Sequence, residues 1–265
     1  SKTMSAPVYL YYRLKNFHQN YRQYQISHDD TQLSGGTDYP IDDCKPFRYP
    51  GEINGVSRNA DGIAYTSYFY NPCGTVAWSM FNDSISLYKV TSSAAIDTTS
   101  VNLPTNVDVV CVGKDFSASG VSTNAANLCS KTGIALSADV DTRYTAPSQT
   151  ALTWSNSGKS GSDDPFLAGG YYAFEAGHKL PVPTDEDFMV WARTASMPDF
   201  WKLYRVINVD LVAGDYLFDI EEYFDVTSFE GEKHVVLATR AWIGGKNYAL
   251  GIILIVVGCF SFVLA

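Results

Sequence analysis

The sequence predicts a mainly β fold, in which an antiparallel β-sandwich-like domain with short helices and long loops is followed by one apolar α-helix. Short runs rich in aromatic and β-branched residues recur along the chain, and segments dense in Gly, Pro, Asp and Asn separate them. One stretch before the C-terminus has a clear helix-start signal. The last 18 residues, by contrast, carry no charged side chain.

Several segments have the length and composition of strands, and some of them alternate apolar and polar side chains. They are residues 7–14, 63–70, 84–90, 107–112, 200–211, 215–226 and 233–243. Residues 228–232 join the last two and predict a hairpin-like connection between them.

Thr184 predicts the start of a short helix. Its hydroxyl can cap the first turn while Asp187 returns the hydrogen bond, as in a capping box with Asp in place of the usual Glu. Phe188 and Trp191 then supply an apolar face, and Pro198 ends the helix.

The remaining segments predict loops. Residues 15–30 mix aromatic side chains with amides and charges without a period, which indicates a loop or an irregular strand. His28, Asp29 and Asp30 lie in this segment, and we interpret them as an exposed polar turn rather than a metal site. Residues 35–61 are dense in Gly, Pro, Asp and Asn, and residues 91–164 are small and polar, so both predict surface segments.

Residues 248–265, YALGIILIVVGCFSFVLA, predict a transmembrane helix. Apolar residues would cover every face of this helix and leave no polar stripe for water. At about 1.5 Å per residue the segment would extend roughly 27 Å, close to the bilayer core of about 30 Å. A buried core helix or strand is the alternative, but core segments are usually shorter. We therefore expect residues 1–247 on one side of a membrane.

The charge balance and the cysteines indicate which side. The chain has 28 acidic and 19 basic residues, which argues against binding nucleic acid. Cys44, Cys73, Cys111 and Cys129 precede the apolar helix, and none forms a CxxC motif or has a histidine at metal-ligand spacing. We expect disulfides, for which three pairings exist and nearest-neighbour pairing is the simplest. Disulfides imply an oxidising lumen or the cell exterior.

Asn82 opens the sequence Asn-Asp-Ser, the only N-glycosylation sequon of the chain without an intervening proline. A sequon becomes a glycan site only in the lumen, so this observation agrees with the disulfides. The chain begins without an apolar signal sequence, and we expect an upstream segment to direct it there.

No catalytic, cofactor or metal constellation is recognisable. The four histidines are isolated in the sequence, and HExxH and GxSxG are absent. Carboxylate pairs occur at residues 163–164, 185–187 and 221–222, where we expect solvated surface. A membrane-tethered glycoside hydrolase stays open as an alternative, because its acids converge only in three dimensions.

Five stretches together resemble the ligand-effect-modulator family, the non-catalytic β-subunits of type IV P-type ATPase phospholipid flippases. They are residues 11–35, 44–48 (CKPFR), 71–84 (NPCGTVAWSMFNDS), 185–205 and 242–252 (WIGGKNYALGI). The resemblance runs in order over nearly the whole chain.

The resemblance implies a glycoprotein with two membrane spans and a large exoplasmic domain between them, of which residues 248–265 are most of the second span. It implies a disulfide between Cys44 and Cys73 and a glycan on Asn82, whereas a Cys111 to Cys129 bridge depends on the redox argument alone. It also implies an obligate partner, the catalytic subunit, which the chain binds in the endoplasmic reticulum, accompanies on export and supports in the ATPase cycle. ATP hydrolysis and lipid passage would belong to that partner, so no enzyme activity and no cofactor are expected here.

A short segment before the apolar helix is the predicted membrane interface and partner-docking region. It contains Trp242, Gly244, Gly245, Lys246 and Asn247. Amphipathic rings and snorkelling cations gather at such interfaces, although a simple linker is the alternative. A single-span cell-surface lectin or receptor with a β-sandwich head remains the rival function, and an upstream apolar segment in the gene would distinguish the two.

Overall fold

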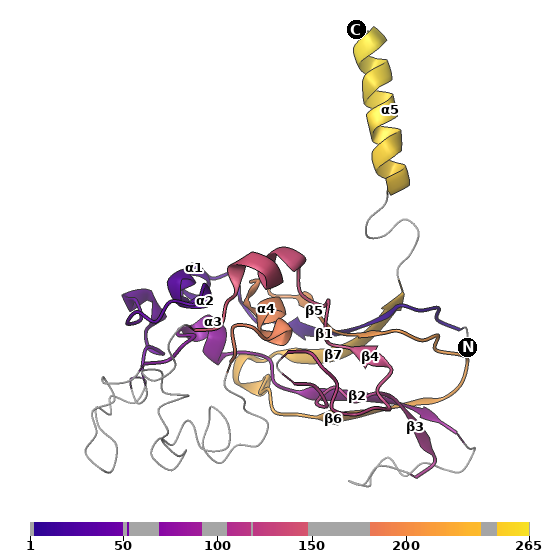
Figure 1. The fold of residues 1–265 in the computed structure, drawn as a ribbon, viewed down its shortest axis with the longest axis horizontal. Coiled ribbons are helices and arrows are strands. Elements are labelled where there is room, and N and C mark those ends of the chain that lie inside the picture. The colour runs from indigo at the N-terminus through magenta and orange to yellow at the C-terminus, as the bar shows by residue number, and fades with distance from the viewer. Residues whose placement is uncertain are drawn as a thin grey trace.

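The protein is described by a computed structural model, which covers residues 3–49, 52, 69–91, 105–117, 119–147, 181–239 and 248–264. Two antiparallel sheets form its centre (Figure 1). The four-stranded sheet has the order β4 (Cys129–Ser130), β5 (Phe200–Ile207), β1 (Val8–Lys15) and β7 (Glu232–Thr239). The three-stranded sheet has the order β3 (Val107–Cys111), β2 (Ser84–Val90) and β6 (Tyr216–Glu221). The predicted antiparallel, mainly β fold is confirmed.

Strand β1 is central to the larger sheet, where it pairs with β5 on one side and β7 on the other. Its even-numbered residues are buried and alternate with half-buried odd-numbered ones, and Leu10 and Leu14 are completely buried. They pack in one apolar cluster with Ile85 of β2, so the two sheets face each other across a shared core. The alternation in the sequence thus places one face of β1 inside the sandwich.

The predicted strands at residues 7–14, 84–90 and 107–112 are confirmed as β1, β2 and β3. Strand β5 is shorter than predicted, since Leu211 leaves it and makes an isolated bridge with Met4. The predicted strand at residues 63–70 lies outside the described residues except for its last two positions.

The predicted hairpin between β6 and β7 is wrong, because the two strands lie in different sheets. The Asp83 carboxylate accepts hydrogen bonds from the backbone N–H groups of Tyr223 and Phe224, which ends β6 and draws the chain away from its ladder. Phe224 then packs into the core between the sheets. The connection therefore crosses the sandwich instead of turning back on one sheet.

The predicted helix forms as α4 (Glu186–Ala192), but its cap differs from the prediction. Asp185, not Thr184, is the N-cap, and its carboxylate accepts a hydrogen bond of 2.9 Å from the Asp187 backbone N–H. The Asp187 side chain instead bonds to Arg205, so no capping box forms. The helix ends at Ala192, before Pro198 is reached.

A region of single-turn helices packs beside the sandwich. It comprises residues 16–49 and 69–82, and we call it the helical lobe. Its helices are α1 (Arg22–Gln25), α2 (Asp30–Leu33), η1 (Asp42–Cys44) and α3 (Thr75–Trp78). Residues 15–30 were expected to be irregular, and α1 and the start of α2 correct that prediction. Two further one-turn elements, η4 (Asp139–Arg143) and η6 (Thr227–Phe229), lie outside this lobe.

The C-terminal helix α5 (Tyr248–Leu264) has 17 residues and stands apart from the two sheets (Figure 1). Its large apolar side chains from Ile252 to Phe262 are exposed. In the part of the chain that the structure describes, no helix reaches the length and apolar content required to cross a membrane. The predicted interface segment, residues 242–247, falls outside the described residues.

Candidate interaction surface and glycan site

The outer face of the four-stranded sheet carries an aromatic strip. Because side chains alternate along β1, Tyr9 and Tyr11 point away from the core that Leu10 enters. The Tyr11 ring lies 6.1 Å from the ring of Trp201 on β5, and Trp201 is 52% exposed. Leu203 and Val236 pair with Tyr11 from its two sides. We call Tyr9, Tyr11, Trp201, Leu203 and Val236 the outer strip.

Charged pairs border the outer strip. Arg13 Nε donates a 2.8 Å hydrogen bond to Asp199, and the Arg13 guanidinium lies 5.9 Å from the centre of the Trp201 ring. The hydrogen bond from Arg13 holds the pKa of Asp199 below its usual value. Lys15 bonds similarly to Glu232 at 2.6 Å and lowers the pKa of that carboxyl. The strip is thus an apolar patch with a charge-balanced rim, a composition found at protein interfaces.

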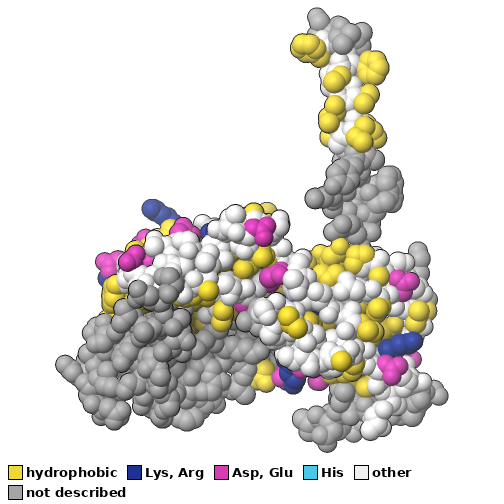
Figure 2. Space-filling view, viewed as in Figure 1, with side chains coloured by type: hydrophobic (Ala, Val, Ile, Leu, Met, Phe, Trp, Pro, Cys, Tyr) yellow, Lys and Arg dark blue, Asp and Glu magenta, His cyan; other side chains and the backbone are white. Residues whose placement is uncertain are grey.

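The four-stranded sheet lies between the three-stranded sheet and α5 in Figure 1, so its outer face, which carries the strip, is turned toward the side of α5. Hydrophobic side chains gather on the surface of the sandwich nearest that helix (Figure 2). This surface was not predicted from the sequence. The signal was nevertheless present, since residues 8–12 read VYLYY and place aromatic rings on both faces of one strand.

A cavity of about 520 Å³ opens at the end of the sandwich where β2 begins and β6 ends. Its lining combines aromatic rings, carboxylates and cations, from residues Tyr12, Phe81, Asn82, Lys114, Phe116, Arg205, Glu221 and Tyr223 among others. Such a volume is typical of sites for small ligands.

The sequon residue Asn82 lies in the wall of this cavity. Both polar atoms of its side-chain amide are buried and have no hydrogen-bond partner among the described residues. The next two residues are fixed firmly. Asp83 binds two backbone N–H groups and receives a 2.6 Å hydrogen bond from Lys233, and Ser84 begins β2.

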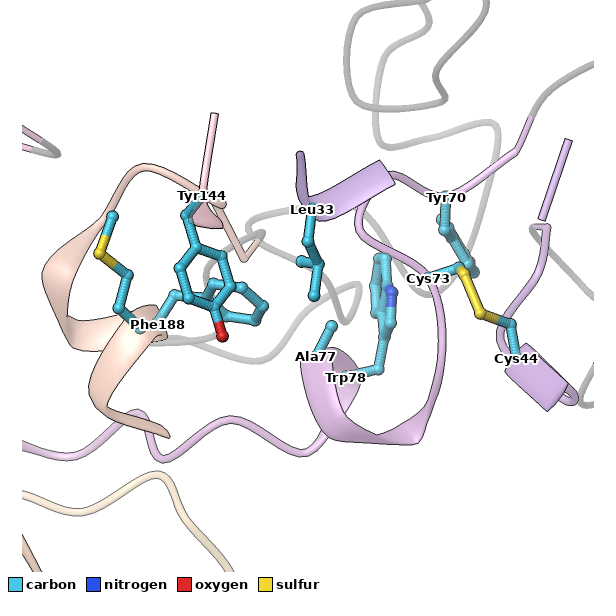
Figure 3. Packing of buried hydrophobic residues seen from close by; sticks show 9 residues of the cluster. Leu33, Cys44, Tyr70, Cys73, Ala77, Trp78, Tyr144 and Phe188 are labelled. Atoms are coloured by element: carbon cyan, nitrogen blue, oxygen red, sulfur yellow. A yellow bond between two sulfur atoms is a disulfide. The ribbon is translucent and has the colours of Figure 1, made fainter. Parts of the chain in front are cut away.

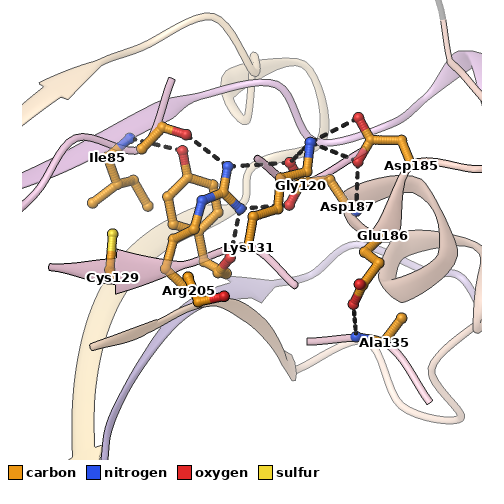
Figure 4. Close-up of polar contacts among 12 residues, drawn as sticks. Ile85, Gly120, Cys129, Lys131, Ala135, Asp185, Glu186, Asp187 and Arg205 are labelled. Carbon is orange, nitrogen blue, oxygen red and sulfur yellow. Dashed lines mark hydrogen bonds and ion pairs between the residues drawn. The ribbon is translucent and has the colours of Figure 1, made fainter. Parts of the chain in front are cut away.

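The carboxylates at 185 and 187 were expected to be solvated surface, and the structure corrects this. Lys131 Nζ lies 2.7 Å from Asp185 and 3.0 Å from Asp187, and Arg205 lies 2.6 Å from Asp187 (Figure 4). Burial acts to raise the pKa of Asp187, but the charges of Arg205 and Lys131 outweigh it and leave the pKa below its usual value. Burial, followed by the charge of Asp187, raises the pKa of Asp185. The pair thus holds α4 on β5 and the loop at Lys131.

The carboxylate pair at residues 221–222 has other partners. Glu221 forms an ion pair with Lys114, whereas the Glu222 side chain is 72% exposed. Residues 163–164 lie outside the described residues. In the described part of the chain, no group of three or more His, Cys, Asp or Glu side chains is placed to hold a metal ion. His28 lies 3.4 Å from Asp30, while Asp29 caps α2.

The first disulfide joins Cys44 to Cys73 inside the helical lobe, with Cα atoms 5.7 Å apart. Tyr70 and Trp78 pack beside it at one end of an apolar cluster that extends to Tyr144 (Figure 3). Gln32 is completely buried next to it. Its amide donates to the Tyr70 carbonyl at 3.1 Å and accepts from the Cys73 backbone N–H at 2.9 Å.

The second disulfide joins Cys111 of β3 to Cys129 of β4, with Cα atoms 5.3 Å apart. Because β3 and β4 belong to different sheets, this bond ties the two layers of the sandwich together. Val8, Leu87 and Ile207 surround it. The structure therefore contains the nearest-neighbour pairing, and the free thiol of Cys259 is exposed on α5.

Known proteins match this chain over its whole length. The model of the LEM3 (ligand-effect modulator 3) / CDC50 family matches residues 1–265. Cell cycle control protein 50A of Mus musculus is 33% identical over 283 residues, which cover 99% of this chain and 64% of that protein. ALA-interacting subunit 3 of Arabidopsis thaliana is 30% identical over 267 residues, which cover 100% of this chain and 59% of that protein. Cell cycle control protein 50B of Homo sapiens is 30% identical over 261 residues, which cover 96% of this chain and 63% of that protein. The chain spans about three fifths of the length of these relatives.

Proposed function

The chain belongs to the LEM3/CDC50 family, and we propose that it acts as an accessory, non-catalytic subunit of a phospholipid-translocating P-type ATPase. The observation that carries this proposal is the family match over all 265 residues. The names of the plant relatives support it, since they describe those proteins as subunits that interact with ALA. In this role the chain binds the catalytic subunit, assists its folding and export from the endoplasmic reticulum, and supports its activity.

We place α5 in the membrane, together with flanking residues. Its exposed side chains are apolar around the whole helix, with Ile252, Leu254, Ile255 and Phe260 each at least 60% exposed. Apolar surface of this extent is unfavourable in water and favourable against lipid. Residues 242–247 then lie at the interface, and residues 1–247 form the domain outside the bilayer.

This domain is proposed to lie on the lumenal or extracellular side of secretory-pathway membranes. Two disulfides support that placement, because such bonds persist in oxidising compartments. The same side would allow N-glycosylation at Asn82. No other bound group is needed for the proposed role.

The outer strip is the surface that we propose for the partner. It combines the exposed ring of Trp201 and the half-buried rings of Tyr9 and Tyr11 with a charge-balanced rim, and it faces the side of α5, where the membrane part of a transporter would lie. Aromatic and Arg residues are the side chains that most often dominate binding energy at interfaces. An acidic substitution in the strip would place an unpaired charge in such an interface.

Co-purification tests the proposal. The full-length protein, extracted from its native membrane in mild detergent, should bring down a large P-type ATPase at about equal stoichiometry, identified by mass spectrometry. Trp201→Asp should lose the ATPase. Val121→Asp is the matched control, because Val121 is 65% exposed on a loop and does not belong to the strip, and it should retain the ATPase. Recovery of the stable chain alone would refute the proposed function, and equal recovery by both variants would refute the assigned surface.

A further inference from the structure

The two sheets of the sandwich have edge strands on two sides, and one side is closed by a covalent bond. On that side the disulfide between Cys111 and Cys129 joins β3 to β4. On the opposite side the two sheets end at β6 and β7. We call the surface between these two strands the open seam, and its residues are Phe218, Ile220, Val235 and Leu237.

Apolar side chains of β6 are exposed at the open seam although they belong to the inner face of their sheet. On β2, Ile85 and Leu87 are buried between the two sheets. Their partners across the ladder are Ile220 and Phe218 of β6. Residues directly opposite each other on antiparallel strands have their side chains on the same face. Phe218 and Ile220 are nevertheless 36% and 41% exposed, so the four-stranded sheet does not extend far enough over β6 to cover them.

The edge of β7 offers unpaired backbone groups at the same seam. With eight residues β7 is the longest of the four edge strands, and within the described residues it pairs with β1 alone. Every second residue of such a strand directs its N–H and C=O groups away from the sheet. Residues 235–238 carry neither a charge nor a proline, which are common means of protecting an edge. This edge is therefore suited to accept a further strand.

We propose that the edge of β7 receives an extended strand of the catalytic subunit, which continues the four-stranded sheet. The added strand lies about 4.8 Å beyond β7 and places its inward side chains over Phe218 and Ile220 of β6. In such an addition main-chain hydrogen bonds give affinity, and the contacts of alternate side chains give specificity. The added strand therefore has apolar residues at alternate positions. This inference rests on the proposed function and specifies how the partner is bound.

The surroundings of β7 identify the occupant. Backbone donors and acceptors at the edge call for an extended polypeptide rather than a lipid. The open seam is continuous with the outer strip, because Val236 of the strip lies between Val235 and Leu237 of the seam. Residues 240–247 connect β7 to α5, so the edge is within reach of a membrane-embedded partner. The edge of β6, by contrast, has Asp219 near its centre and belongs to the sheet farther from α5 (Figure 1).

Hydrogen exchange at the amides of β7 tests the strand addition directly. The full-length protein in mild detergent is measured in two forms, bound to the ATPase that co-purifies with it and free of it. In the complex, every second amide of residues 232–239 should exchange at least about tenfold more slowly than in the free protein, because exchange must then wait for local opening. The amides of β3 are the control, since this edge strand lies on the side closed by the disulfide, and their exchange should not change.

A pair of matched variants tests the contact with β6. Ile220→Asp places an unpaired charge beneath the added strand and should lower the recovery of the ATPase at least about tenfold. Ile26→Asp is the control, because Ile26 is also 41% exposed but lies at the end of α1 in the helical lobe, and it should retain the ATPase. The unfolding temperatures of both variants should stay close to that of the wild type.

The outcomes distinguish this inference from the proposed function. If no ATPase co-purifies with the wild type, the proposed function fails and the inference fails with it. If the ATPase is recovered but exchange in β7 is the same in both forms, or both variants retain the ATPase equally, the strand addition alone is overturned. Slow exchange in free β7 that depends on protein concentration would show pairing with a second copy of the chain and also overturn it.

Discussion

The sandwich and the helical lobe are stabilised in different ways. In the sandwich, long strands exchange regular hydrogen bonds and bury alternate side chains, so that Leu10, Leu14 and Ile207 are fully buried. In the lobe, no α-helix exceeds one turn. Helices this short are unstable alone, because the free-energy cost of helix nucleation exceeds the stabilisation from the hydrogen bonds of one turn. The lobe instead depends on single contacts, and each of these should matter more there than a comparable contact in the sandwich.

Gly74 illustrates such a contact. It has φ of +91°, and a Cβ on it would lie 2.2 Å from the backbone oxygen of Ser27. A backbone conformation of this kind favours glycine, and the close approach excludes any side chain. The glycine that follows Cys73 therefore lets the disulfide segment lie directly against the turn before α2.

Trp191 should give the largest effect, because its ring joins the two regions. It is fully buried among Phe17, Phe200 and Phe224, and its indole N–H donates a 2.8 Å hydrogen bond to the Val76 carbonyl in the lobe. Trp191→Ala should lower the free energy of unfolding by about 3 to 5 kcal/mol through the cavity and the lost bond. Thermal unfolding of the full-length protein in detergent measures it.

Trp201, on the outer face of β5, is the control for that measurement. Trp201 is 52% exposed on the outer strip, so Trp201→Ala should change the free energy of unfolding by no more than about 0.5 kcal/mol. Similar losses in the two variants would mean that Trp191 does not connect the lobe to the sandwich.

Removal of each disulfide should affect a different one of the two regions. Cys44 and Cys73 are 29 residues apart and Cys111 and Cys129 are 18 apart, so loop closure predicts about 3 to 4 kcal/mol for each bond. Cys44→Ser should expose lobe amides to hydrogen exchange while β1 and β5 stay protected. Cys111→Ser should instead loosen the pairing of β4 with β5.

Hydrogen exchange with site resolution distinguishes these outcomes. Loss of protection in both regions from either variant would show that lobe and sandwich unfold as one unit. Normal delivery of the Cys44→Ser protein to the cell surface would argue against the structural role of that bond.

The same contrast explains what the sequence could predict. β1 and β2 follow from period-two alternation and β3 from a short run rich in β-branched residues, which are local properties. The sequences of the lobe helices show no regular spacing of apolar residues, because these helices depend on contacts between distant residues, such as Gln32 with Cys73. The crossing between β6 and β7 was missed since Asp83, about 140 residues earlier, ends β6 by binding the N–H groups of Tyr223 and Phe224. Prediction of the outer strip would have required knowing which face of β1 is covered by the second sheet.

Lys202 is a buried cation of β5, and it predicts a pH dependence. Its ammonium donates to the carbonyls of Val190, Trp191 and Arg193 at the end of α4. Burial, with a smaller contribution from the charge of Arg193, lowers the pKa of Lys202 to about 8. The unfolded chain keeps this proton up to about pH 10.4 and therefore binds more protons between these values. The free energy of unfolding should rise with pH by about 1.4 kcal/mol per unit from pH 8 to about 10.

Above about pH 10 the sign reverses, because burial raises the pKa of Tyr12 and Tyr204 and the unfolded chain then loses protons first. Chemical unfolding of the full-length protein at steps of pH between 8 and 10 measures the slope. Lys202→Met should flatten it, whereas Lys45→Met, at a side chain that is 53% exposed, should leave it unchanged. An equal slope in wild type and Lys202→Met would mean that this ammonium is as well solvated in the folded chain as in the unfolded one.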